Sequence, residues 1–223
     1  KKVAIMRGHE QASDIAITEF IEAIKPYYYV GPFTMDSVTV NPQSTLEVLK
    51  QYDLMVMANP KRPFNNKEKL VLDQFVMSGG RSLWLLDGTR VAGLDQNGQS
   101  LATGQSLNLT DLFFTYGFRI NQNLVLDMVS APITLASLEK TGDYRRFPWW
   151  FSPLVQDHGL HPIMANVDGI KMDYVSSIDT LSFGPKKTVL LHSSPRSKTI
   201  GVPYLIDLNK EIESQIQMTQ STN

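Results

Sequence analysis

The stretch DLMVMANPKRPFNNKEKLVLDQFVMSGGRSLWLLDG, residues 53–88, contains the pattern that decides the fold. Its apolar runs at 54–58 and 82–86 are continuous rather than alternating, which is typical of parallel strands covered on both faces. Between them, Asn65 followed three residues later by Glu68 resembles a capping box and predicts the start of a helix with a single apolar face. The stretch therefore predicts a strand–helix–strand unit with parallel strands.

The same alternation extends back to the start of the chain. Apolar runs predict strands at 3–6 and 27–30, and a helix between them is stopped by Pro26. Asn41 is placed to cap a second helix that runs to about residue 51. Residues 1–90 are therefore expected to form a doubly wound α/β sheet.

The second half of the chain has a weaker pattern. Residues 93–105 are predicted to be a loop and residues 107–116 a helix, and strand candidates follow at 123–128, 155–164, 170–181 and 188–192. We expect one α/β domain over 1–208, with a core of 1–90 and 188–192, elaborations at 91–187 and a polar C-terminal tail at 209–223.

Composition excludes several classes of function. The 223 residues carry a formal net charge of −1, which does not favour a nucleic-acid-binding protein. The absence of cysteine excludes disulfides, thiol nucleophiles and Cys-ligated metals. The sequence contains no phosphate-binding glycine loop and no G-x-S-x-G elbow. We therefore predict no catalytic residues and no cofactor.

Histidines leave two minor alternatives open. His158 and His161 lie in DHGLHP, where glycine and proline favour a loop and no third metal ligand is marked, so no metal site is predicted. His9 and His192 lie at predicted strand ends, and with Asp87 they are the residues that an unrecognised hydrolase site would use.

The loop after the third predicted strand is a candidate binding site. Asn59, Lys61 and Arg62 stand at the end of that strand, and Asp87 at the end of the next. Ligands of open α/β sheets bind at the carboxyl ends of strands, so the two cations could hold an acidic ligand or a saccharide. The alternative is a proline-stiffened turn with solvated charges.

An aromatic run, RRFPWWFSP at 145–153, is the second candidate. In an alternating strand, Phe147, Trp149 and Phe151 would share a core face, and Pro148 would confine the strand to a sheet edge. The residues left over to meet a partner are Arg145, Arg146 and Trp150.

Taken together, these segments resemble a known family. The segment at 52–87 and the motifs LNLTDLFFTYGFRINQNLVLD, SAPITL, RFPWWFSPL, HPIMANVDGI, VSSIDTL and KKTVLLHSS are similar to the auxiliary domain of ABC transport systems, and more narrowly to the gliding-motility-associated GldG type. The resemblance covers nearly the whole chain except the C-terminal tail.

The resemblance implies a function without catalysis. Such a domain lies on the extracytoplasmic (periplasmic) side of the inner membrane, anchored by membrane segments outside this chain. It works with ABC permease and ATPase subunits and with other envelope proteins, by binding protein partners or a ligand. The role in gliding belongs to the narrower resemblance.

The first half also resembles class I glutamine amidotransferase-like domains, which implies a flavodoxin-like three-layer sandwich. Those enzymes carry a nucleophilic cysteine on the turn where this chain has Asp87. A carboxylate there cannot replace a thiolate, so amidotransferase activity is excluded.

Overall fold

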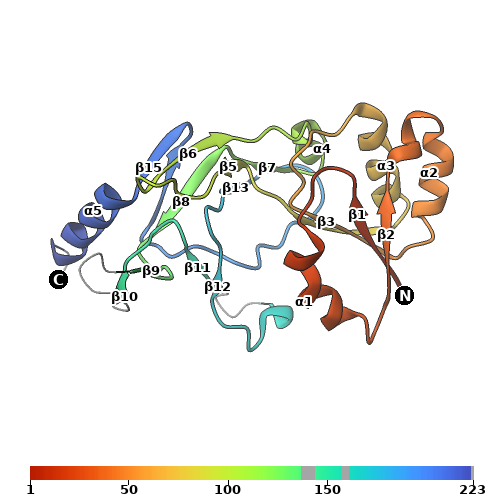
Figure 1. Ribbon diagram of the computed structural model, residues 1–223. Coiled ribbons are helices and arrows are strands. Elements are labelled where there is room, and N and C mark those ends of the chain that lie inside the picture. Colours follow the sequence, from red (N-terminus) through yellow and green to blue (C-terminus); the bar gives the residue numbers. More distant parts are fainter. Residues whose placement is uncertain (137–143, 157–160, 222–223) are drawn as a thin grey trace. The chain divides into compact units, whose positions relative to one another are not determined.

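The computed structural model describes residues 1–136, 144–156 and 161–221 (Figure 1). The chain forms two compact units, and each is described by itself. Unit 1 comprises Lys1–Asp87 and Ser106–Gly117, and unit 2 comprises Gly88–Gln105 and Phe118–Asn223. Among the described residues, no helix combines the length and the apolar character needed to cross a membrane.

Unit 1 is built on a four-stranded parallel sheet. The strands, in sheet order, are β2 (Tyr29–Thr34), β1 (Lys2–Arg7), β3 (Leu54–Ala58) and β4 (Arg81–Leu85). The predicted parallel α/β arrangement is confirmed. The second strand begins two residues later than predicted and runs further, because Tyr27 and Tyr28 complete the turn after the preceding helix by donating to Ile24.

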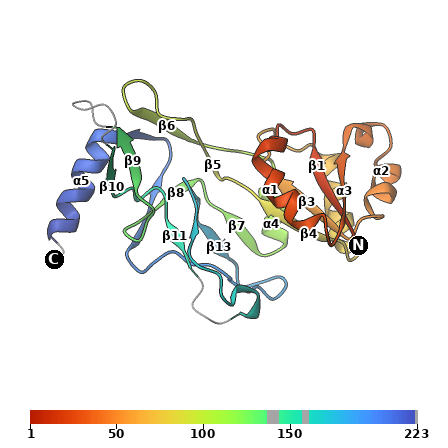
Figure 2. The same cartoon turned by 60° about the horizontal axis from the view of Figure 1, so that its bottom comes forward.

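Helices cover both faces of this sheet (Figure 2). On one side, α1 (Asp14–Ile24) packs Ile17 against Val3 and Val56 of the central strands. On the other side lie α2 (Pro42–Leu49) and α3 (Asn66–Met77), which contact each other. A 3-10 helix, η1 (Asp36–Thr39), and α4 (Thr110–Thr115) complete unit 1. The flavodoxin-like assignment stays a prediction.

Side-chain caps explain where two helices begin. The Asn41 side chain accepts a hydrogen bond from the Ser44 amide at 3.0 Å, and Asn65 accepts one from Glu68 at 3.0 Å. Glu68 reaches back to the Asn65 amide at 2.7 Å, which completes the capping box predicted from sequence. Each cap provides an acceptor for an amide that the first helical turn leaves without an intrahelical partner.

The strands of unit 2 are short and pair in antiparallel fashion. Its largest sheet has three strands, β15 (Tyr204–Asp207), β6 (Gln99–Gly104) and β5 (Thr89–Val91). The remaining strands form two-stranded ribbons: β7 (Phe118–Ile120) with β13 (Ile178–Thr180), β8 (Asn123–Asp127) with β14 (Ser197–Gly201), β9 (Ile133–Ala136) with β10 (Tyr144–Phe147), and β11 (Leu154–Val155) with β12 (Ile170–Lys171). A 3-10 helix, η2 (Pro162–Met164), and α5 (Leu208–Ser221) complete it.

Several expectations for the second half are wrong. Residues 99–104, expected in a loop, form β6, and residues 188–192 form no strand beyond a single bridge between His192 and Gln156. Val189, in the middle of that apolar run, is 51% exposed. An apolar run indicates a buried strand only where neighbouring elements cover it, and here they do not.

The predicted polar tail belongs to the fold. Residues 208–221 form α5, whose Ile212 lies in the apolar core of unit 2 with Leu208 and Ile216 packed against that core. These three residues recur every fourth position and so share one helix face. The buried Gln215 side chain accepts a hydrogen bond from the Trp150 amide at 3.2 Å. The single-domain boundary at 1–208 stays a prediction, because compact units in one chain do not decide whether each folds alone.

A tyrosine that links β15 to α5 gives a pH prediction. The Tyr204 hydroxyl donates to Glu211, and burial, then this carboxylate, raise the pKa of Tyr204 to about 12. The folded state therefore holds this proton above the ordinary pKa of 10.0, so its stabilisation is complete below pH 10 and is lost as the pH rises toward 12. Chemical denaturation should show that Tyr204→Phe lacks this part of the alkaline decline. An identical pH profile in the wild type and the variant would contradict the prediction.

Candidate functional site

Two loops meet at the carboxyl edge of the sheet in unit 1. One follows β1 and the other follows β3, and the amides of Lys61 and Arg62 both donate to the carbonyl oxygen of His9, at 2.8 and 3.2 Å. The Ala12 amide donates to the Ala58 carbonyl at 2.9 Å. These hydrogen bonds hold the two loops together at the edge where ligands of open α/β sheets bind.

The backbone in these loops adopts an uncommon conformation. Glu10, with φ of 51°, and Asn59, with φ of 49°, lie in the left-handed region, as does Gly8 with φ of 107°. Residues other than glycine pay a conformational cost there, and such residues cluster at functional sites. Two of them at the ends of neighbouring central strands mark this edge as a candidate site.

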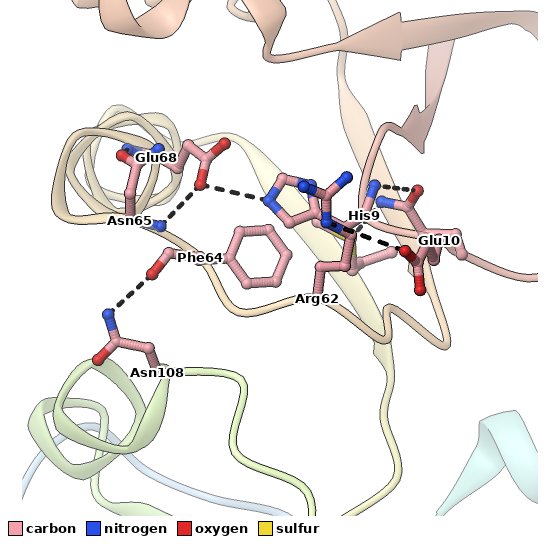
Figure 3. Close-up of polar contacts among 9 residues, drawn as sticks. His9, Glu10, Arg62, Phe64, Asn65, Glu68 and Asn108 are labelled. Carbon is pink, nitrogen blue, oxygen red and sulfur yellow. Dashed lines mark hydrogen bonds and ion pairs between the residues drawn. The ribbon is translucent and has the colours of Figure 1, made fainter.

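A buried hydrogen bond between His9 and Glu68 lies at the site (Figure 3). His9 Nε2 lies 3.2 Å from Glu68 Oε2, and the same oxygen accepts the Asn65 amide. The His9 ring stacks on Phe64, with centroids 4.1 Å apart. His9 Nδ1 is buried and has no hydrogen-bond partner among the described residues. Glu68 thus caps α3 and orients the imidazole at once.

Hydrogen bonds join Phe64 to the residues that precede α4. The Phe64 amide donates to the Leu107 carbonyl at 2.9 Å, and Asn108 Nδ2 donates to the Phe64 carbonyl at 2.8 Å (Figure 3). Because Phe64 is almost completely buried, the ring beneath His9 has a fixed position.

The structure brings three of the predicted site residues together. Lys61 Nζ lies 3.1 Å from Asp87 Oδ2, and the Asn59 amide donates to the Leu85 carbonyl at 2.8 Å. Asn59 Oδ1 is buried with no hydrogen-bond partner among the described residues. Lys61 therefore has a carboxylate partner in Asp87, as Arg62 has in Glu10.

A cleft of about 270 Å³ opens beside this cluster. It is lined among others by Arg7, His9, Asp36, Arg62, Asn65 and Glu68. Arg62 is 63% exposed, and its Nε lies 4.0 Å from Glu10 Oε1 (Figure 3). Of the predicted residues, the cleft includes Arg62, whereas Asn59, Lys61 and Asp87 are not part of its lining. Its mixture of guanidinium, carboxylate and amide groups suits a polar occupant with both donors and acceptors.

Sequence reasoning did not single out Arg7 and Asp36 for this site. Arg7 ends β1, and Asp36 follows β2. The rule that identified Asn59 and Asp87 applies to Arg7, which follows the strand predicted at 3–6. It does not reach Asp36 from the strand predicted at 27–30, because β2 runs further, to Thr34.

The aromatic run at 145–153 is mostly core, and the expectation for Trp150 is wrong. Trp149, Trp150 and Phe151 are 3%, 6% and 0% exposed, and all three lie in the apolar cluster of unit 2. The strand β10 ends at Phe147, so the next residues form a turn, and strand alternation does not apply to them. Arg145 and Arg146 are exposed on β10 and stay candidate binding residues.

His161 has a structural setting. His161 Nδ1 accepts a hydrogen bond from the Ile163 amide at 3.2 Å and so caps η2, and His158 lies outside the described residues. Asp87 of the suggested hydrolase set pairs with Lys61, and His9 pairs with Glu68. Within the described ranges, no group of three or more His, Cys, Asp or Glu side chains is arranged to hold a metal ion.

Comparison with known proteins gives a fold relative and a family. A solved structure titled mmIFT52 N-terminal domain is similar over 91% of this chain and 77% of its own length, with a TM-score of 0.59 and 13% identity, a likeness that shows the fold alone. A comparison with curated proteins finds no match. A family model described as "ABC-type uncharacterized transport system" matches residues 1–222, which includes the helix that sequence reasoning had placed outside the family resemblance.

Proposed function

The chain belongs to the auxiliary family described as ABC-type uncharacterized transport system, and from this premise we propose that it is a non-catalytic binding domain of a transporter auxiliary subunit. The observation that carries the proposal is the polar cleft at the carboxyl edge of unit 1, held in shape by the pair of His9 and Glu68. A cleft whose polar side chains are held in place before a partner arrives loses less conformational entropy on binding, which favours a binding role.

The engagement of two carboxylates at this edge supports binding rather than catalysis. Glu68, which lines the cleft, accepts the Asn65 amide as a helix cap, and Asp87, which lies outside the lining, pairs with Lys61. A general base must be able to accept a proton from a bound substrate, whereas these carboxylates already serve donors of the protein itself. The cleft therefore offers recognition groups, among them the exposed Arg62.

The proposed setting follows from the family resemblance. We place the domain on the extracytoplasmic side of the inner membrane, where it acts with permease and ATPase subunits and other envelope proteins, and we assign its anchorage to membrane segments outside this chain. A role in gliding is the narrower form of the same proposal. Neighbouring permease and ATPase genes in the source genome are the observation expected to support this setting.

The cleft gives the partner proposal a direct test. The intact membrane protein should co-purify with its permease and ATPase, and Arg62→Ala should weaken that association by about tenfold or more, as expected for a truncated interface arginine. Arg196→Ala, an exposed arginine of unit 2, is the matched control and should leave the association unchanged. If the wild type brings down neither subunit, the partner proposal fails; if Arg62→Ala binds as the wild type does, the cleft is not the contact surface.

A second candidate function is the binding of a small polar ligand in the same cleft. Arginine side chains beside Asp36 and Asn65 fit the hydroxyl groups of a saccharide or a small anion. Thermal denaturation in the presence of saccharides and anions should then show a higher melting temperature, since a ligand that binds only the folded state stabilises it. A screen in which no compound at millimolar concentration shifts the wild type would count against this candidate.

A further inference from the structure

The edge of the unit 1 sheet opposite the cleft carries an exposed aromatic cluster. Because the four strands are parallel, their amino ends lie together, and Figure 1 shows the chain start beside the start of β2. There Tyr27, Tyr28 and Tyr29 are 78%, 41% and 67% exposed, and Met77 at the end of α3 is 70% exposed. Side chains this exposed add little to the core of unit 1, and an exposed cluster of aromatic side chains marks an interaction surface.

Cations surround these aromatic side chains. The strand starts and the last turns of the helices at this edge carry five cationic residues, Lys1, Lys2, Lys25, Lys50 and Arg81, all exposed, and three acidic residues, Glu22, Glu47 and Asp53. The whole chain, in contrast, has a net charge of −1. This surface, with Tyr27, Tyr28, Tyr29 and Met77, is called the amino-end face below, and it is locally positive.

One acidic group on this face is already engaged. The Lys2 amide donates to Asp53 Oδ2 at 2.7 Å, and this hydrogen bond is the main reason that the pKa of Asp53 lies below its usual value. Lys25 and Lys50 stand at the C-terminal ends of α1 and α2, where a cation complements the helix dipole. The dipole explains why lysines stand there, but it does not explain the adjoining tyrosines.

An apolar groove of about 250 Å³ opens onto the same face. Phe20 and Ile24 of α1 form one wall, and Leu54 and Leu83 of the strands form the other, with Lys2 and Arg81 at the rim. Leu83 pairs in register with Val56, so it lies on the sheet face that α1 covers, yet it is 37% exposed. The helix covers β1 and β3 and leaves the β4 side of the groove open.

We propose that the amino-end face docks on an anionic lipid surface. Tyrosine is favoured at the headgroup level of a bilayer because its ring is apolar and its hydroxyl is polar. Lysine and arginine are attracted to anionic headgroups, and the groove gives an apolar group of the lipid a place beside them. Because the chain belongs to a family described as a transport system, a lipid bilayer is the anionic surface that we expect near it. The inference uses the edge opposite the cleft, so it does not rest on the proposed ligand or subunit contact.

Vesicle sedimentation of the 223-residue chain tests the proposal. The chain should bind vesicles that contain phosphatidylglycerol at least several-fold more strongly than pure phosphatidylcholine vesicles. Binding should fall as salt is added, because the Debye length shrinks to about 3 Å at 1 M salt. The doubly substituted Lys25→Gln, Lys50→Gln chain should lose about fivefold in partitioning for each lysine removed.

Two further variants distinguish an effect of the amino-end face on vesicle binding from a general effect of lost charge or lost folding. Lys186→Gln with Lys210→Gln makes the same charge change on exposed residues of unit 2 and should leave partitioning unchanged. Tyr27→Ser removes the most exposed tyrosine and should weaken binding several-fold while circular dichroism shows a folded chain. Equal binding to both vesicle types, absence of binding, or an equal loss in the unit 2 control would overturn the proposal, and the second of these would point to an acidic protein partner instead.

Discussion

Replacement of Phe151 by alanine is expected to lower the free energy of unfolding by about 3–5 kcal/mol, the range found when a large buried aromatic is truncated. Phe151 is completely buried, and its ring centroid lies 5.1 Å from that of Trp149 and 6.1 Å from that of Tyr174. The lost transfer free energy and the cavity left among these rings both add to the loss. Chemical denaturation followed by tryptophan fluorescence would measure it.

Phe183→Ala is the matched control, because it removes the same atoms from a ring of unit 2 that is 47% exposed. It should cost about 1 kcal/mol or less. If the two variants were equally destabilised, the aromatic cluster would not be the core of unit 2, and its description as structural rather than ligand-binding would be wrong.

Glu68→Ala is expected to destabilise the chain by about 3 kcal/mol. The substitution removes the carboxylate that accepts the part-buried Asn65 amide, which breaks the capping box of α3, and it removes the hydrogen-bond partner of the buried His9 Nε2. Loss of a cap costs about 1 kcal/mol, and a buried donor left without an acceptor adds about 1–3 kcal/mol. Glu68→Gln keeps an oxygen at this position, so it should cost about 1 kcal/mol.

The measurement for this second prediction is again chemical denaturation, accompanied by the proton resonances of His9. In Glu68→Ala the imidazole should lose its fixed environment, whereas in Glu68→Gln it should keep it. A loss for Glu68→Ala no larger than that for an exposed acidic residue such as Glu213→Ala would show that the pair does not support the cleft.

The sequence predicts unit 1 well because its signals are local and agree with one another. The continuous apolar strand 54–58 and the cap formed by Asn65 and Glu68 each have a meaning that neighbouring residues alone determine. In unit 2 the strands have two to six residues and pair over long distances, as β6 does with β15. Short segments of this kind carry little periodicity, so the strand at 99–104 and the absence of one at 188–192 depend on tertiary contacts.

The sequence indicates the edge of the sheet but not the lining of the cleft or its pairings. The rule for carboxyl ends of parallel strands led to Asn59, Lys61, Arg62 and Asp87, which follow β3 and β4, and of these four residues Arg62 lines the cleft. The pairing of Lys61 with Asp87 spans 26 positions, and that of His9 with Glu68 spans 59. No local pattern specifies such partners, and the burial of Trp150 likewise depends on a turn that strand alternation does not describe.

The division of the chain into two units limits where the protein can be truncated and where its gene can recombine. Unit 1 is completed by residues 106–117, where Phe113 packs edge-to-face on Trp84 with ring centroids 5.3 Å apart, and this segment follows an excursion of the chain into unit 2. No uninterrupted stretch of the gene therefore encodes either unit by itself. A truncation after Asp87 would remove the aromatic partner of Trp84. Recombination of the gene at that point would therefore transfer an incomplete unit 1. A fragment that keeps all of unit 1 must run to Gly117 and therefore also carries residues 88–105 of unit 2.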